Sequence, residues 1–205
     1  MKFFSPDSKF AQIMTSLGEM MMLNLCYILA CLPLVTIGAA NVAMYTILGR
    51  RLREEGSGTI VPFFKAWWQN LGMGLFFWLV QLFVTVSLGM FFFLPFPVFL
   101  KVIAGILLVL VTVLLSIIYP QIARFRNRRF AYLRNAVILL VTRFKWVLAN
   151  LALLLSPVLL FLLAPVEFLQ LGFIWILFGF SGLFYLSAKT MQKVLQPLEE
   201  LSSAK

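Results

Sequence analysis

Long stretches without any charged side chain constrain the fold of this chain more than any other feature. An α-helix needs roughly 20 apolar residues to cross the hydrocarbon core of a bilayer. The chain is 62% hydrophobic and 12% charged, whereas a soluble domain carries about 25% charged residues. We therefore predict an all-α, polytopic transmembrane helix bundle that forms a single domain over residues 1–205. The charge-free stretches are 20–49, 66–100, 102–123, 146–166 and 168–188.

Most of these stretches fit one membrane crossing each, but the first is ambiguous. Pro33 breaks a helix because it lacks a backbone donor, and Gly38 permits a turn or a close helix approach. We interpret this stretch as a hairpin of two short helices, which gives about six crossings. One long kinked crossing is the alternative, and it gives five. The predicted crossings are 16–32, 39–53, 71–94, 100–122, 146–164 and 169–188.

The distribution of basic residues favours six crossings with both termini inside. Lysine and arginine concentrate in the cytoplasmic loops of multi-pass proteins. With six crossings, every one of the 17 basic residues except Lys101 lies inside. Five crossings would move Lys2 and Lys9 outside and leave every later loop unchanged. No signal-peptide cleavage motif follows the first apolar stretch, so we expect that stretch to be retained as a membrane segment.

Aromatic residues gather on one face of a predicted short helix at 59–70. Phe63, Phe64, Trp67 and Trp68 recur at the spacing of a helical face. Aromatic side chains are enriched at the membrane–water interface. We therefore predict that this helix lies in the cytoplasmic interface as an anchor.

The most basic part of the chain is a segment predicted as a cytoplasmic or interfacial helix at 124–143. Anionic lipid of the cytoplasmic leaflet is its expected partner, and a protein partner is the alternative. A nucleic-acid partner is not expected, because the chain contains no soluble reader domain. The basic residues of this surface are Arg124, Arg126, Arg128, Arg129, Arg134, Arg143 and Lys145.

Small residues follow the predicted break of the first hairpin. Small side chains let helix backbones approach closely inside a membrane. We predict close helix packing here, either within this chain or against another membrane protein. The residues of this motif are Pro33, Thr36, Gly38, Ala39 and Ala40.

The sequence offers no catalytic set. It has no histidine, which removes the commonest general base and metal ligand. Glu19 and Glu167 lie near predicted helix ends, where a carboxylate suits the interface. Cys26 and Cys31 are interpreted as small buried hydrophobic residues. We therefore expect no enzymatic activity, no metal and no cofactor.

The run Leu32-Pro33-Leu34-Val35-Thr36-Ile37-Gly38-Ala39-Ala40 is followed by Ala43-Met44-Tyr45, by basic residues and by Glu54-Glu55-Gly56. This pattern resembles the YesL-like family of small bacterial integral membrane proteins of unknown function, most clearly over about residues 15–75. The resemblance implies a multi-pass protein of the bacterial cytoplasmic membrane. Members of that family tend to be encoded beside carbohydrate ABC importers and glycan-degrading enzymes. The resemblance implies no catalytic residues for this chain.

The leading functional hypothesis is therefore a non-catalytic auxiliary or regulatory subunit of a carbohydrate (oligosaccharide) ABC importer, with permease subunits or other membrane proteins as partners. A stand-alone small-solute transporter or channel is the first alternative, and a membrane sensor or assembly factor is the second. The transporter alternative predicts a polar cavity inside the membrane. Its candidate lining residues are Asn24, Thr36, Asn41, Gln81, Thr85, Ser116 and Asn150.

The sensor or assembly alternative predicts a specific result for the basic segment. Neutralising Arg126, Arg128 and Arg129 should abolish the cellular phenotype while membrane abundance, measured by immunoblot, stays unchanged. A parallel fall in abundance would show that these residues serve topology alone.

Overall fold

The computed structural model describes residues 9–55 and 58–203, and it contains helices and turns but no strand over those ranges. Lys2 and Lys205, which enter the charge argument, and the Gly56-Ser57 link lie outside the described residues. The helices are α1 (Lys9–Cys31), α2 (Ile37–Leu52), α3 (Ile60–Gln69), α4 (Leu71–Phe93), α5 (Val98–Arg124), α6 (Arg129–Thr142), α7 (Phe144–Leu163), α8 (Pro165–Gln170), α9 (Gly172–Ile174) and α10 (Phe180–Ser203), with a 3-10 turn at Leu34–Thr36 and a π-helical turn at Trp175–Gly179.

Within the described ranges, five helical segments are long and apolar enough to cross a membrane, which indicates a multi-pass integral membrane protein. The second predicted crossing is not among them. Its helix, α2, has 16 residues and spans about 24 Å at about 1.5 Å per residue, less than the roughly 30 Å of the hydrocarbon core. The count of six crossings and the sidedness built on it remain predictions. The five segments are Phe10–Cys31, Leu71–Phe93, Val98–Arg124, Phe144–Leu163 and Gly172–Leu198.

Several helix boundaries differ from those expected. Helix α1 begins at Lys9 rather than at residue 16. The last predicted crossing, 169–188, is divided among the end of α8, α9, the π-helical turn and α10, and α10 continues to Ser203. Residues 125–128, expected to be helical, form a non-helical linker. The hydroxyl of Tyr132 holds this linker by donating to the Phe125 carbonyl at 2.6 Å and accepting from the Asn127 amide at 3.0 Å.

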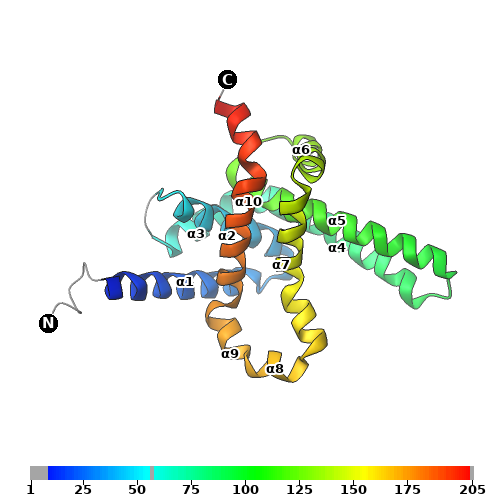
Figure 1. Cartoon of the computed structure of the whole chain (residues 1–205), viewed down its shortest axis with the longest axis horizontal. Helices are drawn as coiled ribbons and strands as arrows, with labels where there is room; N and C mark the ends of the chain where they lie inside the picture. Colours follow the sequence, from blue (N-terminus) through cyan, green and yellow to red (C-terminus); the bar gives the residue numbers. More distant parts are fainter. Residues whose placement is uncertain (1–8, 56–57, 204–205) are drawn as a thin grey trace.

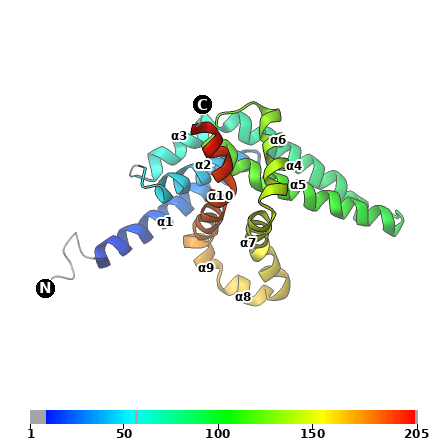
Figure 2. The same cartoon turned by 45° about the horizontal axis from the view of Figure 1, so that its top comes forward.

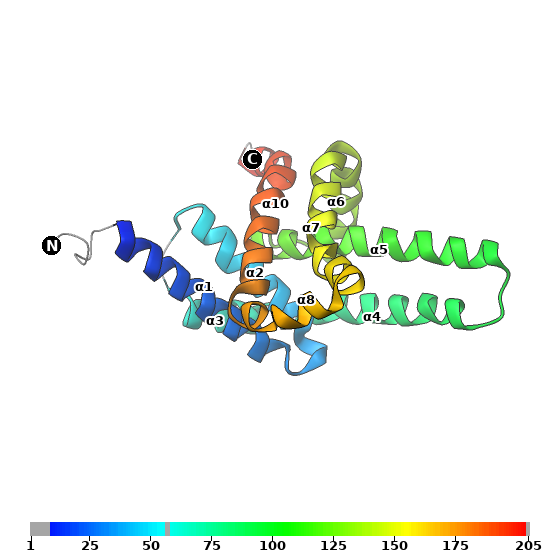
Figure 3. The ribbon, with the colours of Figure 1, turned by 60° about the horizontal axis from the view of Figure 1, so that its bottom comes forward.

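Helix α2 forms the centre of the structure. Nine of its residues are buried, among them Ala40, Met44 and Leu48, and it contacts α1, α3, α4, α5 and α10. The α4–α5 hairpin and the α7–α10 hairpin both start from this centre and run crosswise to each other, while α1 forms a third arm (Figures 1, 2 and 3). The helices therefore do not form one bundle of parallel helices, but two hairpins that diverge from a buried helix.

The outer part of the α4–α5 hairpin has little protein around it. Of the 23 residues of α4, only Gly74 and Phe77 are buried. Apolar side chains such as Phe83 and Phe93 are largely exposed. Contiguous exposed apolar surface of this extent is unfavourable in water and favourable in hydrocarbon, so this surface supports the assignment to a membrane.

Small residues bring α2 and α4 into backbone contact. A methyl group at Gly74 would lie 2.6 Å from the Cα and the backbone nitrogen of Ala39. A methyl group at Gly38 would overlap the Gly74 carbonyl. The Trp78 indole nitrogen donates to the Leu34 carbonyl at 2.8 Å, which ties α4 to the 3-10 turn. The predicted small-residue motif thus packs within this chain.

The break after α1 is closed by a side chain of the same motif. Pro33 precedes the 3-10 turn with an extended backbone. The Thr36 hydroxyl lies 2.7 Å from the Ala30 carbonyl and 2.8 Å from the Pro33 carbonyl. A single hydroxyl hydrogen can serve these two acceptors in turn, so Thr36 satisfies backbone groups that the break releases.

Asn24 performs a similar task at the π-helical turn. A π turn departs from the regular α-helical hydrogen-bond ladder. The amide nitrogen of Asn24 donates to the carbonyls of Trp175 and Ile176 at 3.1 and 2.6 Å, and its oxygen accepts from the Ser181 amide at 2.8 Å. This completely buried asparagine therefore fixes α1 against the start of α10.

The α2–α4 contact generates the first structural prediction. Gly74→Ala should lower the melting temperature of the detergent-purified protein by several degrees, because overpacking costs about 1–3 kcal/mol. Gly72→Ala is the matched control, since a methyl group there meets nothing within 4 Å. Equal melting temperatures for the two variants would contradict the close contact.

Candidate functional site: a polar cleft between two hairpins

A partly open cleft lies where the two hairpins diverge from α2. It encloses about 650 Å³, including the part that opens to the surroundings. Five helices contribute to it, and its lining combines amide, hydroxyl and aromatic groups with leucine side chains. The lining residues are Asn41, Tyr45, Trp78, Gln81, Thr112, Leu115, Ser116, Tyr119, Leu151, Leu154, Leu155 and Phe184.

The cleft lies well inside the apolar length of its helices. Gln81 is ten residues from the start of α4 at Leu71, and Ser116 is eight residues from the end of α5 at Arg124. At about 1.5 Å per residue, these positions are roughly 15 Å and 12 Å along the helices. Both are about half the thickness of the hydrocarbon core, so the polar groups lie near mid-depth if these helices cross the membrane.

Two amide side chains of the cleft are oriented by tyrosines. The Tyr119 hydroxyl donates to Gln81 Oε1 at 3.0 Å. The Tyr27 hydroxyl donates to Asn41 Oδ1 at 2.8 Å. In both bonds the amide oxygen accepts, so the NH₂ groups of Gln81 and Asn41 are the donors that these side chains can offer to a ligand.

A buried hydrogen-bonded chain extends from the wall of the cleft. The Ser187 hydroxyl donates to Asn150 Oδ1 at 2.6 Å and lies 2.6 Å from the Tyr45 hydroxyl. Because a serine hydroxyl has one hydrogen, Tyr45 is the donor to Ser187. This series of hydrogen bonds joins α2, α10 and α7. The amide nitrogen of Asn150, at its end, is buried without a protein partner.

The lining carries no charge. No Asp, Glu, Lys or Arg is among its residues. A charged substrate would be left unpaired in such a site, at a large desolvation cost. Within residues 9–55 and 58–203, no three His, Cys, Asp or Glu side chains gather into a metal-binding group. The arrangement is therefore suited to hydrogen-bonding an uncharged, hydroxyl-rich molecule, with Trp78 and Phe184 as apolar surfaces.

The structure brings together only part of the predicted cavity set. Asn41, Gln81 and Ser116 line the cleft, and Asn150 reaches it through Ser187 and Tyr45. Asn24 and Thr36 instead hold backbone groups, as described above. Thr85 is exposed on α4, one turn beyond Gln81.

The predicted basic surface is spread over the end of α5, the linker, α6 and the start of α7. Arg126, Arg128, Arg134 and Lys145 are exposed, and Arg143 is half-buried. Arg129 lies over the Phe76 ring at 4.4 Å. Arg124 and Arg126 line a separate cavity with Gln69, Asn70 and Tyr132. Exposed apolar residues lie beside these charges on α6: Phe130, Leu133, Val137 and Val141.

The predicted aromatic anchor divides into two parts. Phe63 has no exposed surface and packs in the core, whereas Phe64 and Trp68 are exposed. Trp67 is half-buried, and its indole nitrogen is buried without a partner. Phe63 therefore holds α3 on the core, and the exposed rings of Phe64 and Trp68 are the part of the helix available to the interface.

Sequence reasoning missed the aromatic members of the cleft. Tyr45, Trp78 and Tyr119 each combine a large apolar body with a polar atom that needs a partner when buried. Their position inside charge-free stretches was the available signal. It does not reveal which partner each would find, because those partners come from other helices.

Residues 20–93 match the family model described as "Protein of unknown function, DUF624". The match names an unknown-function family and does not carry the YesL-like name, which stays an interpretation of the sequence. The matched region contains α2, the Gly38–Gly74 contact and the cleft residues Asn41, Tyr45 and Gln81. No curated protein and no solved structure matches the chain.

The buried hydrogen bonds from Tyr45 through Ser187 to Asn150 generate a prediction on stability. Ser187→Ala should destabilise the protein by on the order of 1 kcal/mol, because it leaves the Asn150 amide without its bond. Adding Asn150→Leu should restore part of the loss, since replacing both partners by apolar groups removes the unpaired atoms. Thermal unfolding in detergent measures both. Thr190→Ala on the same helix is the control, and a double variant less stable than Ser187→Ala would refute the pairing.

Proposed function

We propose that this chain is a non-catalytic membrane component of a carbohydrate-uptake system, and that it binds a small neutral sugar in the polar cleft. In this proposal it is an auxiliary or regulatory subunit of an ABC importer in the bacterial cytoplasmic membrane. The observation that carries the proposal is the uncharged cleft between the two hairpins, lined by amides, hydroxyls and aromatic rings.

The chemistry of the lining supports a sugar as the ligand class. Sugar hydroxyls both donate and accept hydrogen bonds, which matches side-chain amides and hydroxyls such as those of Asn41, Gln81 and Ser116. The apolar faces of a sugar ring can pack on aromatic rings, and Trp78 and Phe184 provide such rings. The absence of charge in the lining disfavours anionic or cationic solutes.

The link to an importer is supported by the resemblance of the segment around Leu32–Gly56 to proteins encoded beside such importers. Purification in mild detergent from native membranes tests it. We expect permease or ATPase subunits to co-purify with the tagged chain. A preparation that contains this chain alone, at native expression, would overturn the importer part of the proposal and leave the cleft to be tested separately.

Contact with anionic lipid is proposed for the surface of α6. Its exposed arginines lie beside exposed apolar side chains, and this combination suits a helix in the interface of a negatively charged leaflet.

Sugar binding by the cleft is tested by substitution on α4. Gln81→Ala should weaken the binding of the best ligand from a panel of neutral mono- and oligosaccharides by about tenfold, because a lost hydrogen bond of about 1–1.5 kcal/mol corresponds to that ratio. Calorimetry on the purified protein measures the change. Thr85→Ala, one turn away and outside the cleft, should bind as the unsubstituted protein does. No binding by any member of the panel would refute the proposal.

A stand-alone transporter is the second candidate, and the position of the same cleft well inside the apolar length of α4 and α5 favours it. Flux into proteoliposomes that contain this chain alone discriminates the two. Uptake of a neutral sugar above empty vesicles supports the transporter, and uptake that requires co-purified importer subunits supports the auxiliary role.

A further inference from the structure

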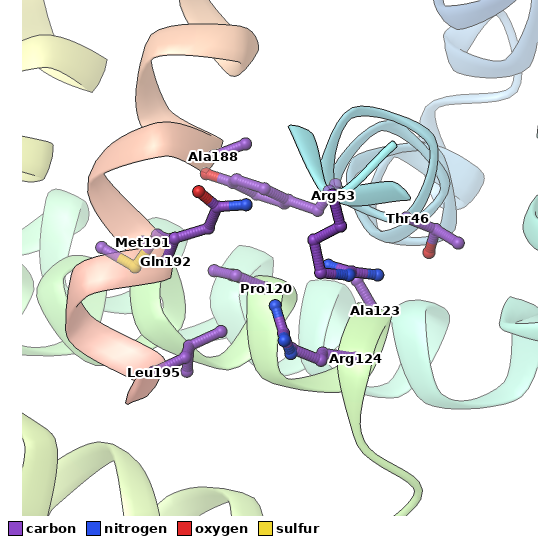
Figure 4. Close-up of a pocket in the computed structure, with 11 residues that line it drawn as sticks. Thr46, Arg53, Pro120, Ala123, Arg124, Ala188, Met191, Gln192 and Leu195 are labelled. Atoms are coloured by element: carbon purple, nitrogen blue, oxygen red, sulfur yellow. The ribbon is translucent and has the colours of Figure 1, made fainter. Parts of the chain in front are cut away.

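A second cavity lies directly beside the cleft, toward the end of α2 that carries Arg50, Arg51 and Arg53. Figure 4 shows it between α2, α5 and α10, with the Arg53 and Arg124 side chains and the Gln192 amide around it. We name it the arginine-end pocket. It is lined by Tyr45, Thr46, Gly49, Arg53, Pro120, Ala123, Arg124, Ala188, Met191, Gln192 and Leu195.

The cleft and the arginine-end pocket are stacked along the same helix faces. On α5, Ser116 lines the cleft and Pro120 lines the pocket. On α10, Phe184 lines the cleft and Ala188 lines the pocket. Residues four apart lie one above the other on a helix, so each pair places the two cavities about one helical turn apart.

Tyr45 is the residue that lines both cavities. Its side chain is 5% exposed, and its hydroxyl donates to Ser187 across the interface with α10. Its ring packs edge-on against Phe184, with the centroids 5.1 Å apart. Tyr45 therefore forms the wall between the cleft and the pocket, and its contacts with Ser187 and Phe184 of α10 hold its hydroxyl and ring.

The backbone hydrogen bonding of α5 is interrupted by Pro120, at the level where Tyr45 separates the two cavities. Pro120 has no N–H, so it cannot donate to the Ser116 carbonyl four residues earlier. The hydrogen-bond ladder of α5 therefore lacks one bond at the level between the two cavities. The helix is thus locally weakened beside the wall that separates the cavities.

The positive charge of Arg53, which lines the arginine-end pocket, is compensated by a neighbouring carboxylate. The Arg53 guanidinium donates to both carboxylate oxygens of Glu55 at 2.8 Å. These bonds, together with the charges of Arg53, Arg124 and Arg50, hold the pKa of Glu55 below its ordinary value, so the carboxylate remains ionised at neutral pH. Thr46 and Gln192 add a hydroxyl and an amide. The space that water can occupy is about 30 Å³ in this pocket and about 200 Å³ in the cleft, so the pocket suits water molecules rather than a sugar ring.

We infer that the arginine-end pocket is a water-filled approach to the cleft from the basic end of α2, and that Tyr45 is the barrier between the two cavities. The inference rests on the proposed function of the cleft. Movement of the Tyr45 ring away from Phe184 and Ser187 joins the two cavities, and the ring in its observed position separates them.

Thiol accessibility tests the barrier without any solute. The starting protein carries Cys26→Ala and Cys31→Ser, which remove its only two cysteines, and Ser116→Cys places one thiol in the cleft. A membrane-impermeant maleimide is added to inside-out and to right-side-out vesicles, and labelling is followed over time. Gly49→Cys, in the arginine-end pocket, reports in a parallel protein which vesicle face opens to that pocket.

From the face that labels Gly49→Cys, we expect slow labelling of Ser116→Cys with Tyr45 present and at least tenfold faster labelling with Tyr45→Ala. Tyr185→Ala is the matched control, because it removes the same side chain at a position that lines neither cavity. It should leave the rate from that face unchanged. Equal rates for the Tyr45→Ala and Tyr185→Ala proteins would overturn the barrier.

Tyr45→Phe keeps the ring, and therefore the packing, and removes only the hydrogen bond to Ser187. It tests the contribution of that bond to the barrier in a protein that is expected to fold normally. We expect a several-fold rise in labelling rate, smaller than for Tyr45→Ala, and an unchanged rate would overturn the role of the hydroxyl. A saturating sugar that binds the cleft should slow the labelling of Ser116→Cys and leave the labelling of Gly49→Cys unchanged, because the sugar occupies the cleft alone. If the sugar changes neither rate, the proposed function of the cleft is refuted while the barrier stands.

Discussion

The backbone contact between α2 and α4 at Gly38 and Gly74 is the interaction on which the rest of the structure depends. A helix of 16 residues that is buried along most of its length can occupy the centre only if its neighbours approach closely. Lipid chains are as apolar as leucine, so association inside a membrane relies on close packing and on hydrogen bonds between helices. The glycines supply the first, and the Trp78 bond to Leu34 supplies the second.

Polar side chains inside the apolar helices fall into two groups with different tasks. Asn24 and Thr36 hold backbone groups that a π-helical turn and a proline break release, and each finds its partners within the protein. The amides of Asn41 and Gln81 instead use their oxygens for tyrosine partners and line a partly open cleft. An unsatisfied polar group is costly in hydrocarbon, so the second group indicates a site that water or a polar solute occupies.

The cleft and the arginine-end pocket together follow α2 from Asn41 to its basic end. The two pairs of residues that place them one turn apart belong to α5 and α10, which are members of different hairpins. A change in the angle between the hairpins would therefore alter both cavities at once. Tyr45, bonded to Ser187 on α10 and carried by α2, lies where such a change would act.

The sequence by itself determined that the chain is helical and apolar enough for several crossings, because charge-free runs need no knowledge of neighbours. It also identified the break at Pro33 and the small residues after it, since proline and glycine act locally. Only the tertiary structure decided that α2 is buried and short, that Phe63 lies in the core, and that Asn41, Gln81 and Ser116 meet while Asn24 and Thr85 do not. The physical reason is that helical periodicity tells which side chains share a face, whereas the packing of separate helices decides which faces meet.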